Sequence, residues 1–303
     1  MRLYCFILIN MIISSLHAQS TKSVKDKVSI AIYGDYLQQN FSWSIAGNSN
    51  GQNPNVLSEL KWKNVKLRGA GIDMKIDIVR GIFFSGTYHK ARIYAGNATD
   101  TDYGEDNRTS PTYMAALESD KGHTYNYFAG LGYQYKIHPS IIISPYAGYS
   151  KARQFLSLTD PHESLQSGET SLNSTYQTNW TGPLVGLTAN TVLKRWVSIQ
   201  TRFSYAQRKY TGVADWNLID EFAHPVSFRH QANGYQNQID LQVNFQVVPK
   251  ISLFIKGYYI HAETGAGTDQ LFFNDGRTVQ SRFNGAVNNT KEIGIGIRYR
   301  PFL

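Results

Sequence analysis

Hydrophobic and polar residues alternate with a period of two along most of this chain. In the stretch NQIDLQVNFQV, at 237–247, five apolar side chains alternate with polar ones, and similar stretches recur to the C-terminus. Successive side chains of a β-strand point to opposite faces, so the pattern predicts strands with one apolar and one polar face. We count ten such segments, at 28–43, 57–76, 81–95, 124–137, 141–158, 174–193, 196–213, 234–247, 251–263 and 291–303.

The links between these segments alternate in length. Short links near 78–81, 136–140, 193–196 and 247–250 alternate with long ones at 44–56, 96–123, 159–173, 214–233 and 264–290. An even number of strands with short turns on one side and long polar loops on the other is typical of an outer-membrane β-barrel. We therefore predict an all-β, ten-stranded antiparallel transmembrane barrel with long extracellular loops and both termini on the periplasmic side.

A soluble β-sandwich is the alternative fold. It gives no reason for the alternation in loop length. It also leaves unexplained the aromatic residues near the segment ends, where barrels carry interfacial girdles. Among these aromatic residues are Trp43, Trp62, Trp180 and Trp196.

The first 18 residues differ from the rest. One basic residue, Arg2, precedes an apolar stretch that ends at Ile13, and small or polar residues follow as far as Ala18. This is the pattern of a secretory signal peptide, and the apolar stretch is shorter than the ~20 residues of a membrane-spanning helix. We predict cleavage after Ala18, which leaves one barrel domain at 19–303. Cys5 is the only cysteine, so this exported domain has no disulfide and depends on packing and sheet closure.

The charge balance is basic. The whole chain has a formal net charge of +8, and loss of Arg2 leaves 29 basic and 22 acidic residues, or +7. An exported barrel meets lipopolysaccharide first, so the expected partner is anionic outer-membrane lipid and not nucleic acid. The sequence has no glycine-rich nucleotide loop and no metal-ligand spacing, so we predict no metal site and no cofactor.

Several short motifs resemble segments of the omptins, ten-stranded outer-membrane proteases with a cleft at the loop-side rim. The stretch GNATDTDY, at 96–103, is similar to the omptin segment that carries one catalytic aspartate pair. Further likenesses follow in order at LSELKW (57–62), AGYSKAR (147–153), PLVGLT (183–188), VSFR (226–229) and GIRYR (296–300). The resemblance implies an omptin-like fold and places catalytic carboxylates at Asp100 and Asp102, just past the third strand. Two carboxylates this close raise one pKa, which suits them to holding and polarising water.

The second catalytic pair of the omptins is incomplete here. Their Asp-x-His motif falls on Asp215 and Asn217, and an amide cannot act as the general base that the histidine supplies. The acids that hold basic substrate residues fall on Asn40 and Val213. A folded loop or a shifted alignment would bring His224 towards the pair as a replacement base. The simpler interpretation of this histidine, and of His89, His123 and His230, is a solvated loop or lumen side chain.

A second omptin feature is partly present. Tyr149, Lys151 and Arg153 alternate along one lipid-directed face, and the resemblance implies contact with lipid A at these positions. Lys151 replaces a family acid, and a family arginine falls on Asn179. Ordinary snorkelling of long cationic side chains at the headgroups is the alternative. The omptin likeness implies no cofactor beyond a dependence on lipopolysaccharide.

Three functions remain open from the sequence. The first is an omptin-fold barrel without normal proteolysis that acts as a small pore or as a surface or structural protein, and we favour this one. The second is an active omptin-type endopeptidase that uses Asp100, Asp102 and Asp215 with an unmatched base. The third is an adhesin or recognition protein that acts through the long loops. The peptide substrate or permeating solute stays open.

Overall fold

The protein is a closed antiparallel barrel. The computed structural model describes residues 28–160 and 171–301, and within these ranges the only helical element is a 3-10 turn at Asp106–Arg108. No described helix is long and apolar enough to cross a membrane. The predicted signal peptide, residues 1–18, lies outside the described residues.

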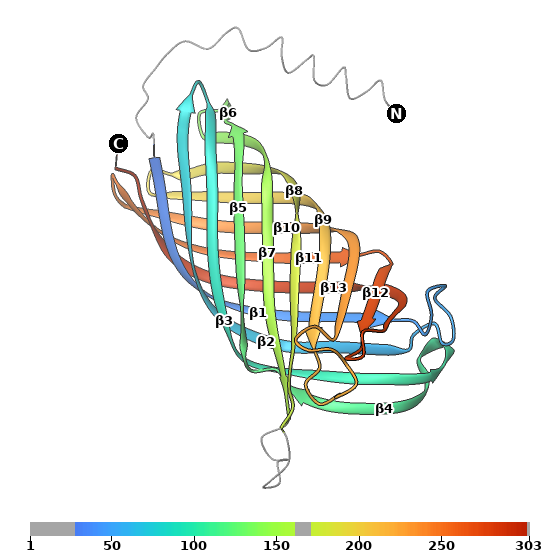
Figure 1. The fold of residues 1–303 in the computed structure, drawn as a ribbon. Coiled ribbons are helices and arrows are strands. Elements are labelled where there is room, and N and C mark those ends of the chain that lie inside the picture. Colours follow the sequence, from blue (N-terminus) through green and yellow to red (C-terminus); the bar gives the residue numbers. More distant parts are fainter. Residues whose placement is uncertain (1–27, 161–170, 302–303) are drawn as a thin grey trace, which may run out of the picture.

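Ten long strands form the ring, and β1 pairs with β13 to close it (Figure 1). The short β6 (Tyr135–His138) follows β5 and pairs with β7. In spatial order the ring strands are β1 (Val28–Ile45), β2 (Ser58–Val79), β3 (Ile82–Glu105), β5 (Gly122–Tyr133), β7 (Ile141–Thr159), β8 (Asn173–Lys194), β9 (Val197–Asp215), β10 (Phe228–Val248), β11 (Ile251–Thr264) and β13 (Thr278–Tyr299). Each corresponds to one of the ten predicted segments, so the predicted fold class is confirmed.

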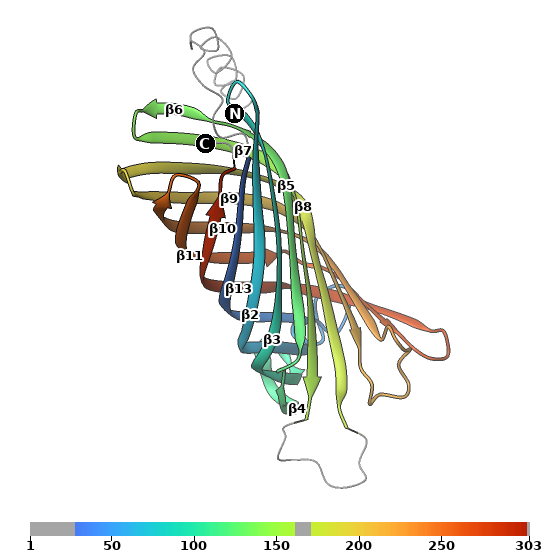
Figure 2. The same ribbon diagram turned by 90° about the vertical axis from the view of Figure 1, so that its left-hand side faces the viewer.

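The loop-side rim is more structured than the sequence pattern predicted. The long links at 96–123 and 264–290 contain two further strands, β4 (Thr109–Glu118) and β12 (Gly267–Phe272). β4 folds back on the extended end of β3, and β12 pairs with both β10 and β13. These extensions project beyond the ring on the side away from the described chain ends (Figure 2). Asp100 and Asp102 therefore lie inside β3 and not past its end.

Side chains on the middle of the ring alternate between an apolar outer face and a polar inner face. Outward apolar side chains are exposed because lipid, not protein, is their solvent. On β1, for example, Ile32 and Tyr36 are exposed while Asp35 between them is buried. Other strands contribute the same outer belt, with exposed Ile72, Leu131, Val185, Leu187, Phe203, Ile239, Leu241, Leu253, Ile255, Ile293 and Ile295.

Towards the loop-side rim this arrangement inverts. Further along β1, Phe41 and Trp43 are 1% and 4% exposed and point inwards, whereas Gln38 and Asn40 are exposed on the outer face. The rim stands in water, so its apolar side chains are buried inside, as in a soluble protein. The resulting core contains a set of rings that we call the aromatic layer: Phe41, Trp43, Trp62, Tyr176, Trp180, Tyr210, Phe228 and Phe283.

Candidate functional site

The two aspartates of the GNATDTDY motif lie on the inner face of β3. Ala98 belongs to the core, and side chains two and four residues further along a strand share its face. Asp100 is paired with Leu60 of β2 on one side and with Ala115 of β4 on the other. β4 therefore covers a position that would otherwise stand free at the rim.

This enclosure changes the acidity of the pair. Burial, together with the neighbouring charge of Asp102, raises the pKa of Asp100 to about 7. Burial also raises the pKa of Asp102, against a hydrogen bond to Ser58 that lowers it. Oδ1 of Asp100 is buried and has no hydrogen-bond partner among the described residues. Asp100 is thus a carboxyl that takes up or releases a proton near neutral pH.

Asp215 is the last residue of β9, and His224 reaches it from the following loop. His224 Nδ1 lies 2.6 Å from Asp215 Oδ1, so the two form a hydrogen-bonded pair. A carboxylate bound to Nδ1 orients the ring and leaves Nε2 as the nitrogen available to a third group. The loop at 216–227 folds back to make this pair, which strand spacing alone does not reveal.

Asn217 has a structural role at the omptin histidine position. Its Oδ1 accepts hydrogen bonds from the backbone N–H of Asn173 at 2.8 Å and from Ser174 Oγ at 3.1 Å. Its Nδ2 donates to the carbonyl oxygen of Ser171 at 3.2 Å. The amide thereby joins the end of β9 to the beginning of β8 and is fully engaged in these contacts.

The two candidate half-sites point in different directions. Ala214 is a core residue, so the side chain of Asp215 beside it lies on the outer face of β9. The side chain of Asp100, by contrast, lies on the inner face of β3. The two positions that match the omptin specificity acids, Asn40 and Val213, also alternate with buried residues. Asn40 is exposed next to the buried Phe41, and its Oδ1 accepts the backbone N–H of Asn64 at 2.8 Å. Val213 likewise alternates with the core residue Ala214. Within the described residues, no hydrogen bond or ion pair joins the two half-sites.

The predicted lipid-contacting residues lie on the outer face of β7. Tyr149 is 57% exposed, and Lys151 and Arg153 are also exposed, with Arg153 Nη2 donating to Gln177 Oε1 at 2.8 Å. Two strands further around the barrel add exposed cations that the omptin resemblance does not include. These are Lys66 and Arg68 on β2 and Lys90 and Arg92 on β3.

These cations and several aromatic rings form one surface, which we call the basic belt: Lys66, Arg68, Lys90, Arg92, Lys151 and Arg153. The Arg68 guanidinium lies 4.6 Å from the centre of the Tyr94 ring, and Lys90 Nζ lies 5.2 Å from that of Tyr125. Tyr125 of β5 pairs with Lys90 of β3 and with Arg153 of β7, so the two cations flank this ring at the same level of the barrel. No ion pair with an acid involves these six side chains in the described part of the chain.

The aromatic layer crosses the interior of the barrel. β8 is five strands from β1 in either direction around the ten-strand ring. Nevertheless, the Tyr176 ring of β8 lies 6.0 Å from Phe41 and 5.7 Å from Trp43 of β1, and 5.5 Å from Trp62 of β2. Opposite walls are therefore in direct contact, and Trp62 and Tyr176 are 1% and 0% exposed.

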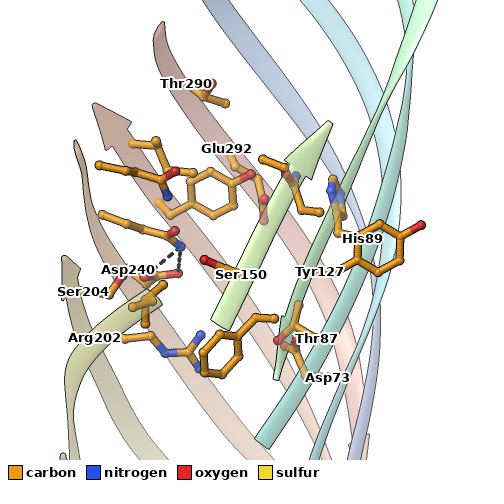
Figure 3. A pocket seen from close by; sticks show the side chains of 18 of the residues that line it. Asp73, Thr87, His89, Tyr127, Ser150, Arg202, Ser204, Asp240, Thr290 and Glu292 are labelled. Atoms are coloured by element: carbon orange, nitrogen blue, oxygen red, sulfur yellow. Dashed lines mark hydrogen bonds between the residues drawn. The ribbon is translucent and has the colours of Figure 1, made fainter. Parts of the chain in front are cut away.

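Below the aromatic layer the lumen is polar. Gln39 of β1 bonds to Gln154 of β7 at 2.7 Å and to Asn288 of β13 at 2.7 Å, which spans the barrel again. A cavity of about 240 Å³ follows, lined by charged, hydroxyl and amide side chains together with apolar ones. Figure 3 shows Arg202, Ser204 and Asp240 on one side of this cavity and Asp73, Thr87 and His89 on the other. The aromatic layer and the polar lumen below it both depend on pairs of residues from opposite walls that are remote in sequence.

Comparisons with known proteins agree with this architecture. The family model described as "Pom: Protochlamydia outer membrane protein" matches residues 32–299. The chain belongs to this family. As a member of the Pom family it is an outer-membrane protein, and the apolar outer belt is the surface that meets the lipid bilayer.

Solved structures give the fold of the Pom chain further support. The outer membrane protease OmpT from Escherichia coli is similar over 94% of this chain and 99% of its own, with 14% identity and a TM-score of 0.70. At that identity the likeness shows the fold alone. The translocator domain of the autotransporter NalP from Neisseria meningitidis matches 98% of this chain and 95% of its own, with 11% identity and a TM-score of 0.38. The P. putida toluene transporter TodX matches 91% of this chain and 90% of its own, with 7% identity and a TM-score of 0.33. Both TM-scores are too low to support any conclusion. No curated protein sequence matches the chain.

Proposed function

We propose that this Pom protein is a surface or structural barrel of the outer membrane, closed to solute flow and held among anionic lipids by its basic belt. The contact between opposite walls through Tyr176 carries the proposal. Small barrels are usually filled by side chains, and open channels require more strands. Here the filling consists of buried rings, which exclude water as well as solutes. We expect the functional contacts of the protein to be made by the loop-side rim and not by the lumen.

The basic belt supports the second half of the proposal. Lys and Arg side chains just above a lipid-facing apolar surface lie at headgroup level, where they pair with phosphate oxygens. Tyr149, Lys151 and Arg153 form one edge of this surface, so lipopolysaccharide is the proposed partner. The long-loop rim would then face outward and both termini would be periplasmic.

Conductance in planar bilayers tests the closed-barrel proposal. We expect the refolded wild-type chain to give no steady channel, and the double variant Phe41→Ala with Tyr176→Ala to give open events, because two of the rings that bridge the lumen are removed. The matched control is Tyr205→Ala, which removes a ring from the outer face. A stable channel in the wild-type protein would instead establish the small-pore function.

One observation favours a second function, omptin-type peptide hydrolysis. The Asp215–His224 hydrogen bond supplies the oriented histidine that the matched position lacks, and Asp100 titrates near neutrality. The opposed directions of the two half-sites count against a shared cleft. The test is cleavage of quenched fluorescent peptides in the presence of lipopolysaccharide. If the second function is correct, both Asp100→Ala and His224→Gln lose activity, whereas Asn217→His gains little.

A further inference from the structure

A buried ionic cluster lies in the lumen below the aromatic layer. Asp35 of β1, His89 of β3 and Glu292 of β13 each offer a ligand atom, and these atoms all lie within 4.8 Å of one another. The three residues are 6%, 3% and 6% exposed. His89 Nε2 lies 2.9 Å from Asp35 Oδ2 and 3.1 Å from Oδ1. We refer to these three residues as the lumen cluster.

Glycines leave the space in which these side chains converge. Asp35 pairs with Gly69 on β2 and with Gly294 on β13. A Cβ at Gly69 would stand 2.3 Å from Asp35 Oδ1 and 2.6 Å from His89 Nε2, and one at Gly294 would stand 2.9 Å from Asp35 Cβ. His89 therefore reaches across β2 to Asp35 only because position 69 has no side chain.

The cluster contains polar atoms that the protein itself does not satisfy. His89 Nδ1 is buried without a hydrogen-bond partner in the described chain. Glu292 is held by Lys256, whose Nζ lies 2.9 Å from Oε1, and by a hydrogen bond from the Tyr258 hydroxyl. Two buried carboxylates thus share one imidazole, one ammonium and one hydroxyl, so part of their acceptor capacity stays unused, and that is costly unless something occupies it.

We propose that Asp35, His89 and Glu292 form a binding site for a divalent transition-metal cation, of which zinc is the preferred example. One imidazole and two carboxylates match the nitrogen and oxygen donors that zinc accepts, and three protein ligands leave a position open to lumen water. Binding moves the His89 proton from Nε2 to Nδ1, so Nε2 presents its lone pair to the ion. The cavity beside the cluster provides room for the water ligand.

Lys256 sets the affinity of this site. Its Nζ lies 3.2 Å from the centre of the Tyr33 ring, so the ammonium is held over that ring while it contacts Glu292. A metal ion must compete with this positive charge for the same carboxylate. The native site is therefore weaker than its ligand set alone would make it, and removal of the lysine charge strengthens it.

Isothermal titration of the refolded barrel with zinc chloride tests the proposal. We expect one equivalent of Zn²⁺ per chain, at least tenfold tighter binding by Lys256→Met, and loss of the site in His89→Gln and Asp35→Asn, both close in shape to the native side chains. His138→Gln, an exposed histidine at the short β6, is the matched control and should bind like the wild type. X-ray absorption should show one nitrogen and two carboxylate oxygen ligands.

Each opposite result overturns the proposal. If the wild-type chain binds no zinc while Lys256→Met does, the lysine is the permanent cation of the cluster and the native protein has no metal site. If His89→Gln binds as tightly as the wild type, the ion lies elsewhere. Folding of every variant is checked beforehand by the mobility of the unheated barrel in gel electrophoresis, so that a missing heat signal reports the site.

Discussion

The loop-side and membrane-level parts of the barrel are built on opposite principles, although the same strands run through both. At membrane level the apolar side chains point outwards and charges such as Asp35 and Glu292 point inwards. At the rim the apolar rings of Phe41 and Trp43 point inwards and amides such as Asn40 point outwards. The difference teaches that the solvent outside each level decides which face is apolar, because only the rim has water on its outer side.

Removal of one central ring should give the largest loss of stability. Tyr176→Ala deletes contacts to Phe41, Trp43 and Trp62 and leaves a cavity, so we expect the free energy of unfolding to fall by about 4 kcal/mol. Urea titration followed by tryptophan fluorescence measures it. Tyr205→Ala, on the outer face, should cost much less. Equal losses would mean that the rim does not have a core of its own.

Crowding of the lumen cluster should have the next largest effect. Gly69→Ala places a methyl group against Asp35 and His89, and we expect a loss of about 3 kcal/mol from overpacking and a disturbed buried pair. The matched control is Gly34→Ala, where the nearest atom to the added Cβ is 3.8 Å away. Comparable unfolding midpoints for the two variants would show that the lumen side of β2 accommodates an added methyl group as readily as the outer side of β1.

Asp100 should make stability depend on pH. Its folded pKa of about 7 lies above the ordinary value of 3.8, so the folded state binds more protons between these two pH values. The contribution of Asp100 to stability is therefore largest below pH 4 and falls as the pH rises to 7. A shift of about three pKa units corresponds to about 4 kcal/mol, and solvent screening of this partly exposed carboxyl reduces it to about 2 kcal/mol. Asp100→Asn should remove this slope in urea titrations at several pH values. A wild-type profile parallel to that of the variant contradicts the assignment.

The smallest effect should come from the basic belt. Cations near an anionic lipid surface contribute about 1 kcal/mol each, so Lys151→Gln with Arg153→Gln should weaken lipopolysaccharide binding about thirtyfold without altering the fold. Lys194→Gln, which removes an exposed cation at the short-turn end of β8, should leave binding unchanged. Binding to lipopolysaccharide-containing vesicles measures both variants. Similar losses in the two would indicate nonspecific attraction by net charge.

The sequence predicts the ring well but not the rim. Period-two alternation identifies all ten ring strands because each has one apolar face at membrane level. The pattern does not identify β4, because the two faces of TSPTYMAALE differ little in polarity and most of its residues are exposed. On β1 the apolar residues change from even to odd positions between Tyr36 and Phe41, a signal of the rim core that can be read without coordinates.

The sequence likewise predicts some features of the candidate sites and not others. That Asp100 and Asp102 share a face is predictable from their spacing, whereas the contact of His224 with Asp215 depends on how a loop folds. The lumen cluster is the least accessible to sequence reasoning. Its residues are distant in the chain, belong to three strands, and meet through register and through an absent side chain at Gly69.

The position of the lumen cluster also bears on how the barrel is assembled. Asp35 belongs to the first strand and Glu292 to the last, and β1 and β13 are the two strands whose pairing closes the ring. His89 and Asp35 can meet once the first three strands are in place, but Glu292 arrives only when the circle is complete. The full set of three side chains is therefore a signature of finished insertion, and a chain arrested before closure leaves the histidine–aspartate pair at an open seam without Glu292.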